Sequence, residues 1–275
     1  NTVSLYVDGG DIVRDRSGNI YLRAGGHGAL LDNLNNIDAD LIFIKNIDNV
    51  SHDRFALNNS YYKKILASYL LKIQSKIHKF LHAVDSGSLT ESMINKIKSI
   101  LVKDFMIKDV DRFFSMGQYN GEEVIKNMYN YLNRPIRVCG MVENKGEPGG
   151  GPFWVFDKKY SMSLQIIEKS QINIKNQFQK EKLQEATHFN PVDIVCSIKD
   201  HNGKKYNLKN YVDKNTGFIS IKSYNGKDIR VMELPGLWNG CMWDWLTIFI
   251  EVPLSTFSPV KEVTDLLRRE HLEFD

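Results

Sequence analysis

A lysine near the C-terminus carries the clearest chemical signal in this chain. Lys261 ends the stretch Phe-Ser-Pro-Val-Lys over residues 257–261. Pro259 fixes the local backbone, so the sequence predicts that Lys261 lies on a defined turn. An ammonium group held there can bind phosphate oxygens and stabilise charge that develops during phosphoryl transfer. An ordinary surface lysine is the alternative, but the apolar neighbours Phe257 and Val260 favour the phosphate-binding interpretation.

An aspartate early in the chain could hold a metal ion. Asp48 lies in the stretch Asn-Ile-Asp-Asn over residues 46–49, which follows an apolar run over residues 41–44 that is typical of a buried strand. In open α/β sheets, ligands bind beyond the carboxyl ends of the strands. Mg²⁺ takes one or two carboxylates together with ligand phosphates. We therefore predict Asp48 as a catalytic residue and Mg²⁺ ligand, although a simple turn residue explains it equally well in isolation.

A glycine-rich turn around one histidine could approach an anionic ligand. Gly26, His27 and Gly28 precede a short helix that we expect over residues 29–35. Glycines let backbone N–H groups come close to a ligand, and the positive end of the following helix suits anionic groups. A plain tight turn, with His27 packed in the core, is the competing interpretation.

Two later stretches have the composition of ligand-binding loops. Residues 146–153 contain three consecutive glycines, including Gly150, and residues 234–240 bring Trp238 next to Asn239. Glycine in the first stretch permits close ligand approach, and an aromatic wall in the second could contact a sugar or base. A flexible surface turn and core packing, respectively, are the alternatives.

Composition narrows the classes of protein. The 275 residues are 42% hydrophobic and 25% charged, and 36 Lys and Arg against 33 Asp and Glu give a net charge of +3. These charges are interspersed along the chain, so we expect no nucleic-acid partner. No apolar run reaches the ~18 residues of a membrane span, so we expect no membrane partner. Three cysteines without paired spacing indicate reduced thiols and a cytoplasmic protein.

Hydrophobic patterning predicts an α/β protein in three parts. Residues 1–52 alternate short strands, turns and a helix, as part of an α/β core. Residues 53–133 form a helical insertion, with helices expected over 61–84, from a capping box at Ser88 to about 105, and over 121–132. Residues 134–275 complete the core as a β-rich part and close with a helix over 263–274. The strands are expected over 3–7, 20–22, 41–44, 137–142, 153–156, 163–167, 194–198, 217–220, 230–233 and 247–252.

The order of these motifs resembles the UDP-sugar pyrophosphorylase family. Its Gly-His-Gly segment, its Asn-x-Asp-Asn strand end and its Phe-x-Pro-Val-Lys ending are similar to the stretches described above, and the second places Asn46 in the substrate site. Family segments that touch the sugar resemble the stretch around Glu168 and the stretch His-Phe-Asn that ends at Asn190. The chain is closer still to a bacterial domain-of-unknown-function family (DUF4301-like) within the same superfamily.

The resemblance implies a GT-A or Rossmann-like mixed sheet flanked by helices. It implies that Asp48 binds Mg²⁺, that Lys261 binds phosphate, that Gly26, His27 and Gly28 line the nucleoside and that Glu168 and Asn190 hold sugar hydroxyls. One departure is clear: the family's glycine-rich Leu-x-Gly-Gly-x-Gly-Thr-Arg-Leu loop does not occur in this sequence. The N-terminal part of the fold is then expected on a missing N-terminal fragment of the same protein, which would act as a partner.

Two functions follow from the resemblance. The first is a nucleotidyltransferase that joins a sugar 1-phosphate to a nucleoside triphosphate, with release of pyrophosphate. The second is a protein that binds a nucleotide-sugar or phosphosugar on the same fold without transfer, which the missing loop favours. A glycosyltransferase is a third, less favoured interpretation, because the ending Phe-x-Pro-Val-Lys resembles pyrophosphorylases.

Overall fold

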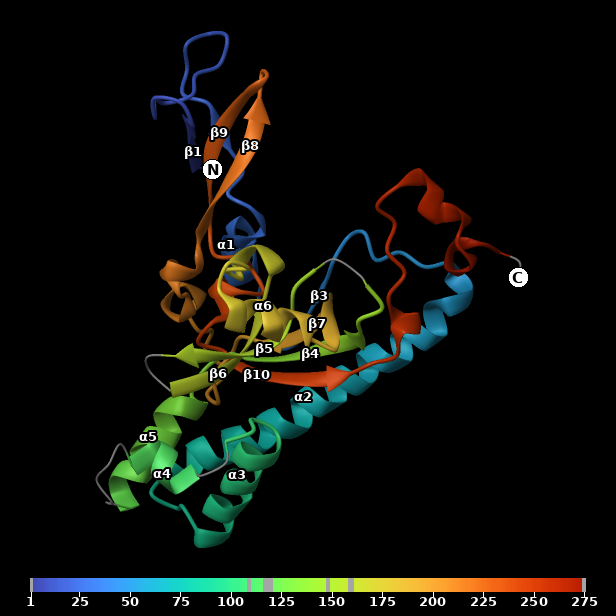
Figure 1. The fold of residues 1–275 in the computed structure, drawn as a ribbon. Helices are drawn as coiled ribbons and strands as arrows, with labels where there is room; N and C mark the ends of the chain where they lie inside the picture. Colours follow the sequence, from blue (N-terminus) through green and yellow to red (C-terminus); the bar gives the residue numbers. More distant parts are fainter. Residues whose placement is uncertain (1, 108–109, 116–120, 147–148, 158–160, 274–275) are drawn as a thin grey trace. The chain divides into compact units, whose positions relative to one another are not determined.

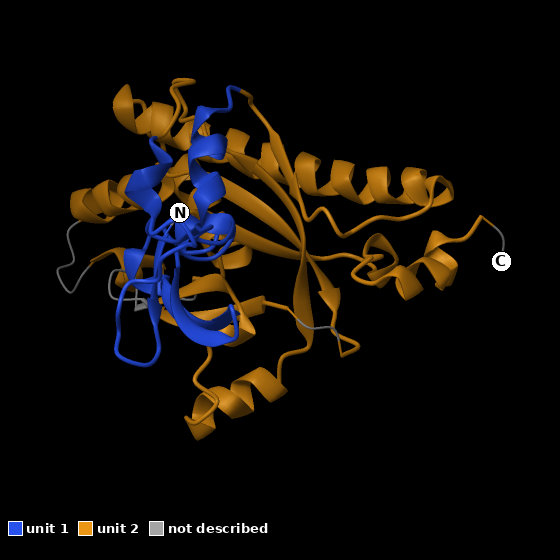
Figure 2. Ribbon diagram, turned by 90° about the horizontal axis from the view of Figure 1, so that it is seen from above, with its two compact units in different colours: residues 1–38, 207–244 blue, residues 39–206, 245–275 orange. Residues whose placement is uncertain are grey.

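The computed structural model of the protein describes residues 2–107, 110–115, 121–146, 149–157 and 161–273. The chain forms two units, which Figure 2 shows in different colours. Unit 1 comprises residues 1–38 and 207–244, and unit 2 comprises residues 39–206 and 245–275. Each unit therefore combines segments that are distant in the sequence. The three-part division at residues 52 and 133 follows other boundaries and remains a prediction.

Unit 1 is built on an antiparallel sheet of four strands in the order β2-β1-β9-β8 (Figure 1). Its elements are β1 (Thr2–Tyr6), β2 (Leu22–Arg23), α1 (Leu31–Asn36), β8 (Phe218–Tyr224) and β9 (Lys227–Glu233). Asn225 and Gly226 turn β8 into β9 with φ of 50° and 74°. Asparagine and glycine tolerate positive φ, and such turns match the twist of a hairpin. Alternation along β9 buries Ile229 and Val231 against Val13.

Unit 2 contains a mixed sheet in the order β10-β4-β7-β3 and a separate hairpin of β5 and β6. The strands are β3 (Ile42–Lys45), β4 (Ile136–Glu143), β5 (Gly151–Asp157), β6 (Ser161–Ile167), β7 (His188–Ser197) and β10 (Leu246–Glu251). β10 runs parallel to β4, whereas β7 runs antiparallel to both β4 and β3. β4 and β7 are buried along nearly their whole length, as expected for strands covered on both faces. The predicted α/β class is therefore confirmed.

Helix α2 (Ala56–Asp85) packs along β4 and β7 (Figure 1). Its apolar residues recur every three or four positions, and Leu66, Leu70 and Ile73 are at most 2% exposed. Burial of each such side chain stabilises the fold by about 1.5–3 kcal/mol. Helices α3 (Glu91–Lys103), α4 (Val110–Ser115) and α5 (Gly121–Leu132) contribute to the same core, whereas α6 (Gln177–Gln184) buries no residue. The helical character predicted for residues 61–132 is borne out in these elements.

The start of α3 differs from the prediction. Its N-cap is Thr90, whose hydroxyl accepts a hydrogen bond from the Met93 N–H at 3.3 Å. Ser88, the predicted cap, lies in the preceding turn, where its hydroxyl is 2.8 Å from the hydroxyl of Ser86. The capping box predicted from Ser88 is therefore wrong, because the chain enters the helix two residues later.

The C-terminal segment also differs from the prediction. Instead of one helix over residues 263–274, the structure has two short 3₁₀ helices, Val263–Leu267 and Arg269–His271. Arg268 between them has extended backbone (φ −71°, ψ 151°), which interrupts the helical hydrogen bonds. Phe274, the last residue of the predicted helix, lies outside the described residues.

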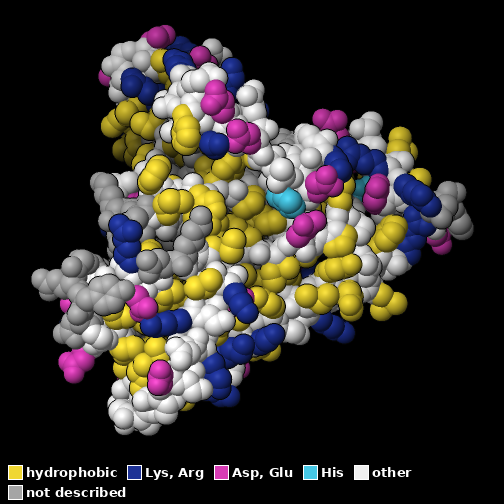
Figure 3. Space-filling view, turned by 60° about the horizontal axis from the view of Figure 1, so that its bottom comes forward, with side chains coloured by type: hydrophobic (Ala, Val, Ile, Leu, Met, Phe, Trp, Pro, Cys, Tyr) yellow, Lys and Arg dark blue, Asp and Glu magenta, His cyan; other side chains and the backbone are white. Residues whose placement is uncertain are grey.

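The surface carries its charge in several small groups. Figure 3 shows one face, on which Lys and Arg side chains lie between acidic and hydrophobic ones. This distribution agrees with the near balance of charges in the sequence. Among the residues that the structure describes, no helix combines the length and apolar character needed to cross a membrane.

Candidate functional site

The segments that carry Asp48 and Lys261 lie side by side in unit 2. A β-bridge pairs Asn49 with Pro259. The N–H of Val260 donates to the carbonyl oxygen of Asp48 at 2.8 Å, so Lys261 is the residue that follows directly on this contact. The structure thus brings together two motifs from opposite ends of the chain, and the catalytic role of the two side chains stays a prediction.

Asn49 holds this junction together from inside. Its side chain is 4% exposed. Its Oδ1 accepts a hydrogen bond from the Ser258 N–H at 2.9 Å, and its Nδ2 donates to the Thr256 carbonyl at 3.2 Å. One amide therefore pairs two backbone groups that would otherwise be buried without partners. The junction is therefore held by hydrogen bonds within the protein.

The two charged groups at the junction differ in their surroundings. Asp48 Oδ1 is buried and has no hydrogen-bond partner among the described residues. Lys261 is exposed, and its backbone N–H donates to Asp265 Oδ2 at 2.8 Å. The backbone N–H groups of Glu262 and Lys261 lower the pKa of Asp265. Its carboxylate therefore fixes the turn on which Lys261 stands.

The orphaned oxygen of Asp48 fits a hard cation. A buried carboxylate oxygen without a donor is costly, and Mg²⁺ would satisfy it. No three His, Cys, Asp or Glu side chains in the described ranges are placed to hold a metal together. The remaining ligands of Mg²⁺ at Asp48 would be water and phosphate oxygens, as is common for this ion.

Gly150, Glu168 and Asn190 form a second group in unit 2. The N–H of Asn190 donates to the Gly150 carbonyl at 2.7 Å. A Cβ at Gly150 would lie 2.8 Å from Glu168 Oε1 and 2.9 Å from the Ile167 carbonyl oxygen, and the backbone contact leaves room only for glycine. Glu168 also caps the short 3₁₀ helix Lys169–Gln171. Residues 147 and 148 of the same glycine-rich stretch lie outside the described residues.

Asn46 is linked to Asn190 through Val192. Asn190 Oδ1 accepts a hydrogen bond from the Val192 N–H at 3.0 Å, and the Asn46 N–H donates to the Val192 carbonyl at 3.3 Å. Val192 has φ of 59°, which is strained for a β-branched residue. Strain of this kind persists only where neighbours enforce it, and it is frequent at functional sites. The sequence contains no local signal for this conformation.

A buried carboxylate between two lysines follows directly after Val192. Asp193 is 5% exposed and pairs in register with Lys45 of β3. Burial raises the pKa of Asp193, while the charges of Lys63 on α2 and of Lys45 act in the opposite direction. Burial also lowers the pKa of Lys45, and the charge of Lys63 adds to that effect. Sequence reasoning missed this group, although an aspartate beside the apolar run of residues 194–198 was a visible signal.

The glycine–histidine motif and residues 234–240 meet in unit 1. The ring of His27 stacks on Trp238, with centroids 3.9 Å apart and planes at 18°. His27 Nδ1 accepts a hydrogen bond from the Leu237 N–H at 2.9 Å, so Nε2 carries the proton of the neutral ring. Asn239 is 2% exposed, and a Cβ at Gly236 would lie 2.4 Å from its Oδ1. These side chains therefore have dense packing within their own unit.

The glycines of this motif are required by packing. A Cβ at Gly28 would lie 1.9 Å from the Pro235 carbonyl oxygen. Gly26 has φ of 81°, and a Cβ there would lie 2.8 Å from Glu233 Oε2. The helix predicted after the motif is a 3₁₀ turn, His27–Leu30, that continues into α1. Ligand contacts by Gly26, His27, Gly28, Trp238 and Asn239 stay predictions.

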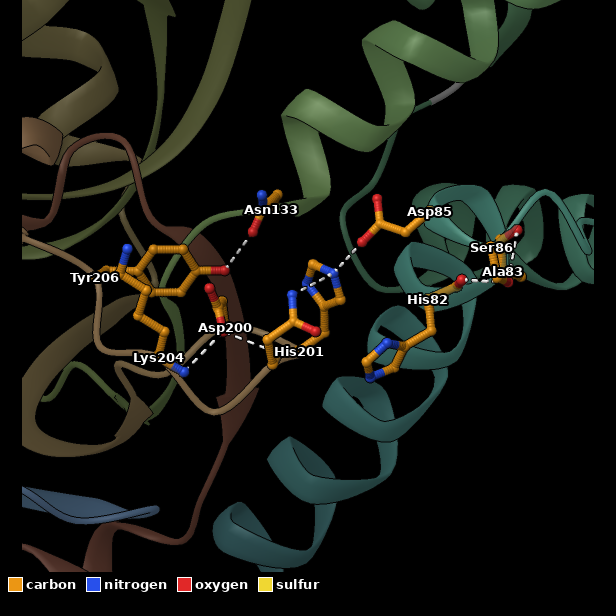
Figure 4. A network of polar contacts seen from close by, with 10 residues as sticks. His82, Ala83, Asp85, Ser86, Asn133, Asp200, His201, Lys204 and Tyr206 are labelled. Carbon is orange, nitrogen blue, oxygen red and sulfur yellow. Dashed lines mark hydrogen bonds and ion pairs between the residues drawn. The ribbon is translucent and has the colours of Figure 1, made fainter.

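A polar network outside these motifs joins α2 to the turn after β7 (Figure 4). His201 Nε2 lies 2.6 Å from Asp85 Oδ2, and His201 Nδ1 is buried without a partner among the described residues. The ring of His82 is 4.8 Å from that of His201, and the ring of His78 is 6.3 Å from it. Burial, together with the charges of His201 and His82, lowers the pKa of His78 to about 4.

Solved structures of two trypanosomatid enzymes show partial likeness to the chain. A mutant UDP-glucose pyrophosphorylase from Leishmania major in complex with UDP-glucose is 16% identical, with a TM-score of 0.32 over 54% of this chain and 33% of that chain. A UDP-glucose phosphorylase from Trypanosoma brucei is 14% identical, with a TM-score of 0.34 over 53% of this chain and 31% of that chain. This chain thus covers about a third of the length of either enzyme.

No curated protein matches the chain. A family match, by contrast, extends from the first strand of unit 1 to the last 3₁₀ turn of unit 2. It covers residues 1–272 and is described as Domain of unknown function (DUF4301). The protein therefore belongs to the DUF4301 family.

Proposed function

We propose that the protein is a nucleotidyltransferase that joins a sugar 1-phosphate to a nucleoside triphosphate and releases pyrophosphate. The observation that carries this proposal is the junction of residues 46–50 with residues 256–260. It sets the buried, unsatisfied Oδ1 of Asp48 beside the turn that presents the exposed Lys261. A carboxylate in need of a cation, on a segment paired with the one that leads into a lysine, suits a polyphosphate ligand accompanied by Mg²⁺.

The reaction needs positioning and charge compensation more than proton transfer. A phosphate oxygen of the sugar 1-phosphate attacks the α-phosphorus, and the bond from that phosphorus to the oxygen bridging to the β-phosphate breaks. The electron pair leaves with pyrophosphate. Bound Mg²⁺ would neutralise phosphate charge, and Asp48 is the residue that would hold it. Lys261 would donate to phosphate oxygens, so that both groups act by electrostatics.

The remaining predicted contacts divide between the units. In unit 2, the Glu168 carboxylate lies beside Gly150, whose carbonyl accepts from the backbone N–H of Asn190, and the side chains of Glu168 and Asn190 would bind sugar hydroxyls. In unit 1, the backbone of Gly26, His27 and Gly28 would line the nucleoside, and Trp238 and Asn239 would contact the substrate. Asn46 would stand between the phosphate and sugar contacts, because it is bonded to the same valine as Asn190.

Binding without transfer is the second candidate, and one observation favours it. His27, the only ionisable side chain predicted on the nucleoside side, is stacked on Trp238 and bonded to Leu237 within its own unit. Its ring therefore already has partners in the protein. A protein that holds a nucleotide-sugar through the contacts of unit 2 needs no further role for His27.

Turnover by the full-length protein tests the proposal. Pyrophosphate release is measured with Mg²⁺ over a panel of nucleoside triphosphates and sugar 1-phosphates. We expect Asp48→Asn and Lys261→Gln each to lower kcat/KM by about 100-fold or more, the usual cost of removing one group that stabilises transition-state charge. Asp53→Asn and Lys76→Gln are matched controls, because both residues are exposed and lie outside the junction.

Two results would change the assignment. Equal rates for Asp48→Asn and the parent would remove Asp48 from the mechanism. Nucleotide binding in a thermal-shift screen, with no turnover on any pair of substrates, would select the binding protein over the transferase.

A further inference from the structure

Asp193 and Lys45 share the face of the unit 2 sheet that looks toward helix α2. Asp193 of β7 stands directly opposite Lys45 of β3 and Gly140 of β4. Residues that are directly opposite one another in a sheet project to the same face. A Cβ at Gly140 would lie 3.3 Å from Leu66 Cδ1 of α2, so this face is the one that α2 covers. Lys63 stands on α2 about one turn before Leu66 and interacts with Asp193.

These three charges do not balance. Asp193 is buried, Lys63 is half-buried and Lys45 is exposed, so both lysines reach solvent whereas the aspartate does not. One carboxylate against two lysines leaves one positive charge. Burial lowers the pKa of Lys45, the charge of Lys63 lowers it further, and the charge of Asp193 acts in the opposite direction. An anion bound between the lysines would relieve the repulsion between them.

The group adjoins the segments that carry the predicted site. Lys45 is the last residue of β3 and directly precedes Asn46. Asp193 directly follows Val192, whose left-handed backbone is enforced by hydrogen bonds to Asn190 and Asn46. Val192 therefore lies between Asn190, which is predicted to bind the sugar, and Asp193. Its backbone conformation sets the direction in which the chain continues to Asp193.

We propose that Lys45 and Lys63 form a second anion-binding position in unit 2 that takes a phosphate group of the substrate, with Asp193 as its buried counter-charge. The identity of the ligand as a substrate phosphate rests on the proposed function, whereas the affinity for a phosphate group rests on the two lysines themselves. Asp193 acts as a positioning residue, because its negative charge attracts both ammonium groups and does not itself attract the anion. An ion cluster that only pins α2 to the sheet is the alternative.

The probe is inorganic pyrophosphate, titrated calorimetrically into the full-length protein without Mg²⁺ at low ionic strength. We expect Lys45→Gln and Lys63→Gln each to weaken binding about tenfold, the loss of one hydrogen bond to a charged group. Asp193→Asn removes a negative charge and should leave binding as strong as in the parent or stronger. Lys64→Gln, the exposed neighbour on the same helix, should leave affinity unchanged. Circular dichroism confirms that each variant is folded, and Lys45→Arg should restore most of the affinity.

The outcomes separate this inference from the proposed function. Unchanged pyrophosphate affinity in both lysine variants, with lower melting temperatures for all three, would overturn the inference and leave an ion cluster that pins α2. In that case turnover that depends on Asp48 would still support the transferase. Weakened binding in the lysine variants, without turnover on any substrate pair, would keep the anion position and reject the transferase.

Discussion

The two regions that sequence motifs marked for ligand binding differ in how far the protein satisfies its own polar groups. In unit 1, His27 is stacked on Trp238 and accepts a backbone hydrogen bond, and the surrounding glycines have no room for a side chain. In unit 2, Asp48 keeps a buried oxygen without a donor among the described residues, and Lys261 stays exposed. Both regions match motifs of the same resemblance, and within the described residues the second leaves a buried oxygen of an ionisable carboxylate without a donor.

This difference between the two regions distinguishes a motif that packing requires from a motif that ligand binding requires. Glycines and a histidine can recur because backbone segments must approach closely, which is a requirement of packing. A carboxylate oxygen buried without a donor lowers stability, so its presence needs another reason, such as a cation or ligand. A buried polar group that lowers the stability of the protein by itself is therefore the criterion for a ligand site. Measuring the free energy of unfolding after substitution tests each region.

The largest expected effect is at Gly28 of unit 1. A Cβ there would lie 1.9 Å from the Pro235 carbonyl oxygen and 2.9 Å from the carbonyl carbon, so the backbone of one segment must move. We expect Gly28→Ala to lower the free energy of unfolding by about 3 kcal/mol, the upper range for overpacking. Differential scanning calorimetry of the full-length protein measures the change.

Gly121→Ala is the control for Gly28→Ala. Gly121 begins α5, and a Cβ there meets no atom within 4 Å. Alanine has the higher helix propensity, so the change should be neutral or slightly stabilising. Equal melting temperatures for Gly28→Ala and the parent would show that the motif of unit 1 has spare room, and the comparison of the two regions would fail.

Much of unit 2 could be predicted because its signals are local. The spacing of Leu66, Leu70 and Ile73 predicts α2, and the apolar run of residues 41–44 predicts β3, which is Ile42–Lys45. Motif order also predicted that Asp48 and Lys261 belong together. The junction itself depends on Asn49, whose amide pairs with backbone groups more than two hundred residues away, and no local pattern specifies such a contact.

Other features were hidden because tertiary contacts decide them. Val192 adopts positive φ against its intrinsic preference, so the sequence could not indicate it. β7 begins at His188, six residues before the predicted strand, because Asn190 and Pro191 break the apolar pattern that marked its continuation. The register that sets Asp193 opposite Lys45 follows from that longer pairing.

A smaller effect on stability is expected from the histidine network of unit 2, which also contains a buried polar atom without a partner among the described residues. His201 Nδ1 is also buried without a partner among the described residues, although Asp85 holds the other ring nitrogen. Burial and the charges of His201 and His82 lower the pKa of His78 from 6.5 to about 4, and the charge of Asp200 opposes them. Because the folded pKa lies below the unfolded value, His78 favours the folded state above pH 6.5 and loses this contribution as the pH falls toward 4.

The measurement is the free energy of unfolding between pH 7.5 and pH 4.5. His78 is partly exposed, so solvent screening reduces the expected loss to about 1 kcal/mol. In His78→Gln the fall in stability over this window should be smaller by that amount. An identical fall in both proteins would show that burial and the rings of His201 and His82 do not disfavour protonation of His78.

The smallest change in stability is expected for Asp48→Asn in unit 2. Its Oδ1 accepts no hydrogen bond from any described residue, so Asp48→Asn breaks none at that oxygen. Removing a carboxylate oxygen from such a position should leave stability unchanged or raise it by up to about 1 kcal/mol, equivalent to 2–4 °C in melting temperature for a protein of this size. The same calorimetry that detects the Gly28→Ala loss measures this change, first without Mg²⁺ and then with it.

A loss of several degrees without Mg²⁺ would place Asp48 with His27 among residues that the fold itself requires. An unchanged melting temperature, together with lost turnover, would mean that the cost of burying this carboxylate is offset only when a cation is bound.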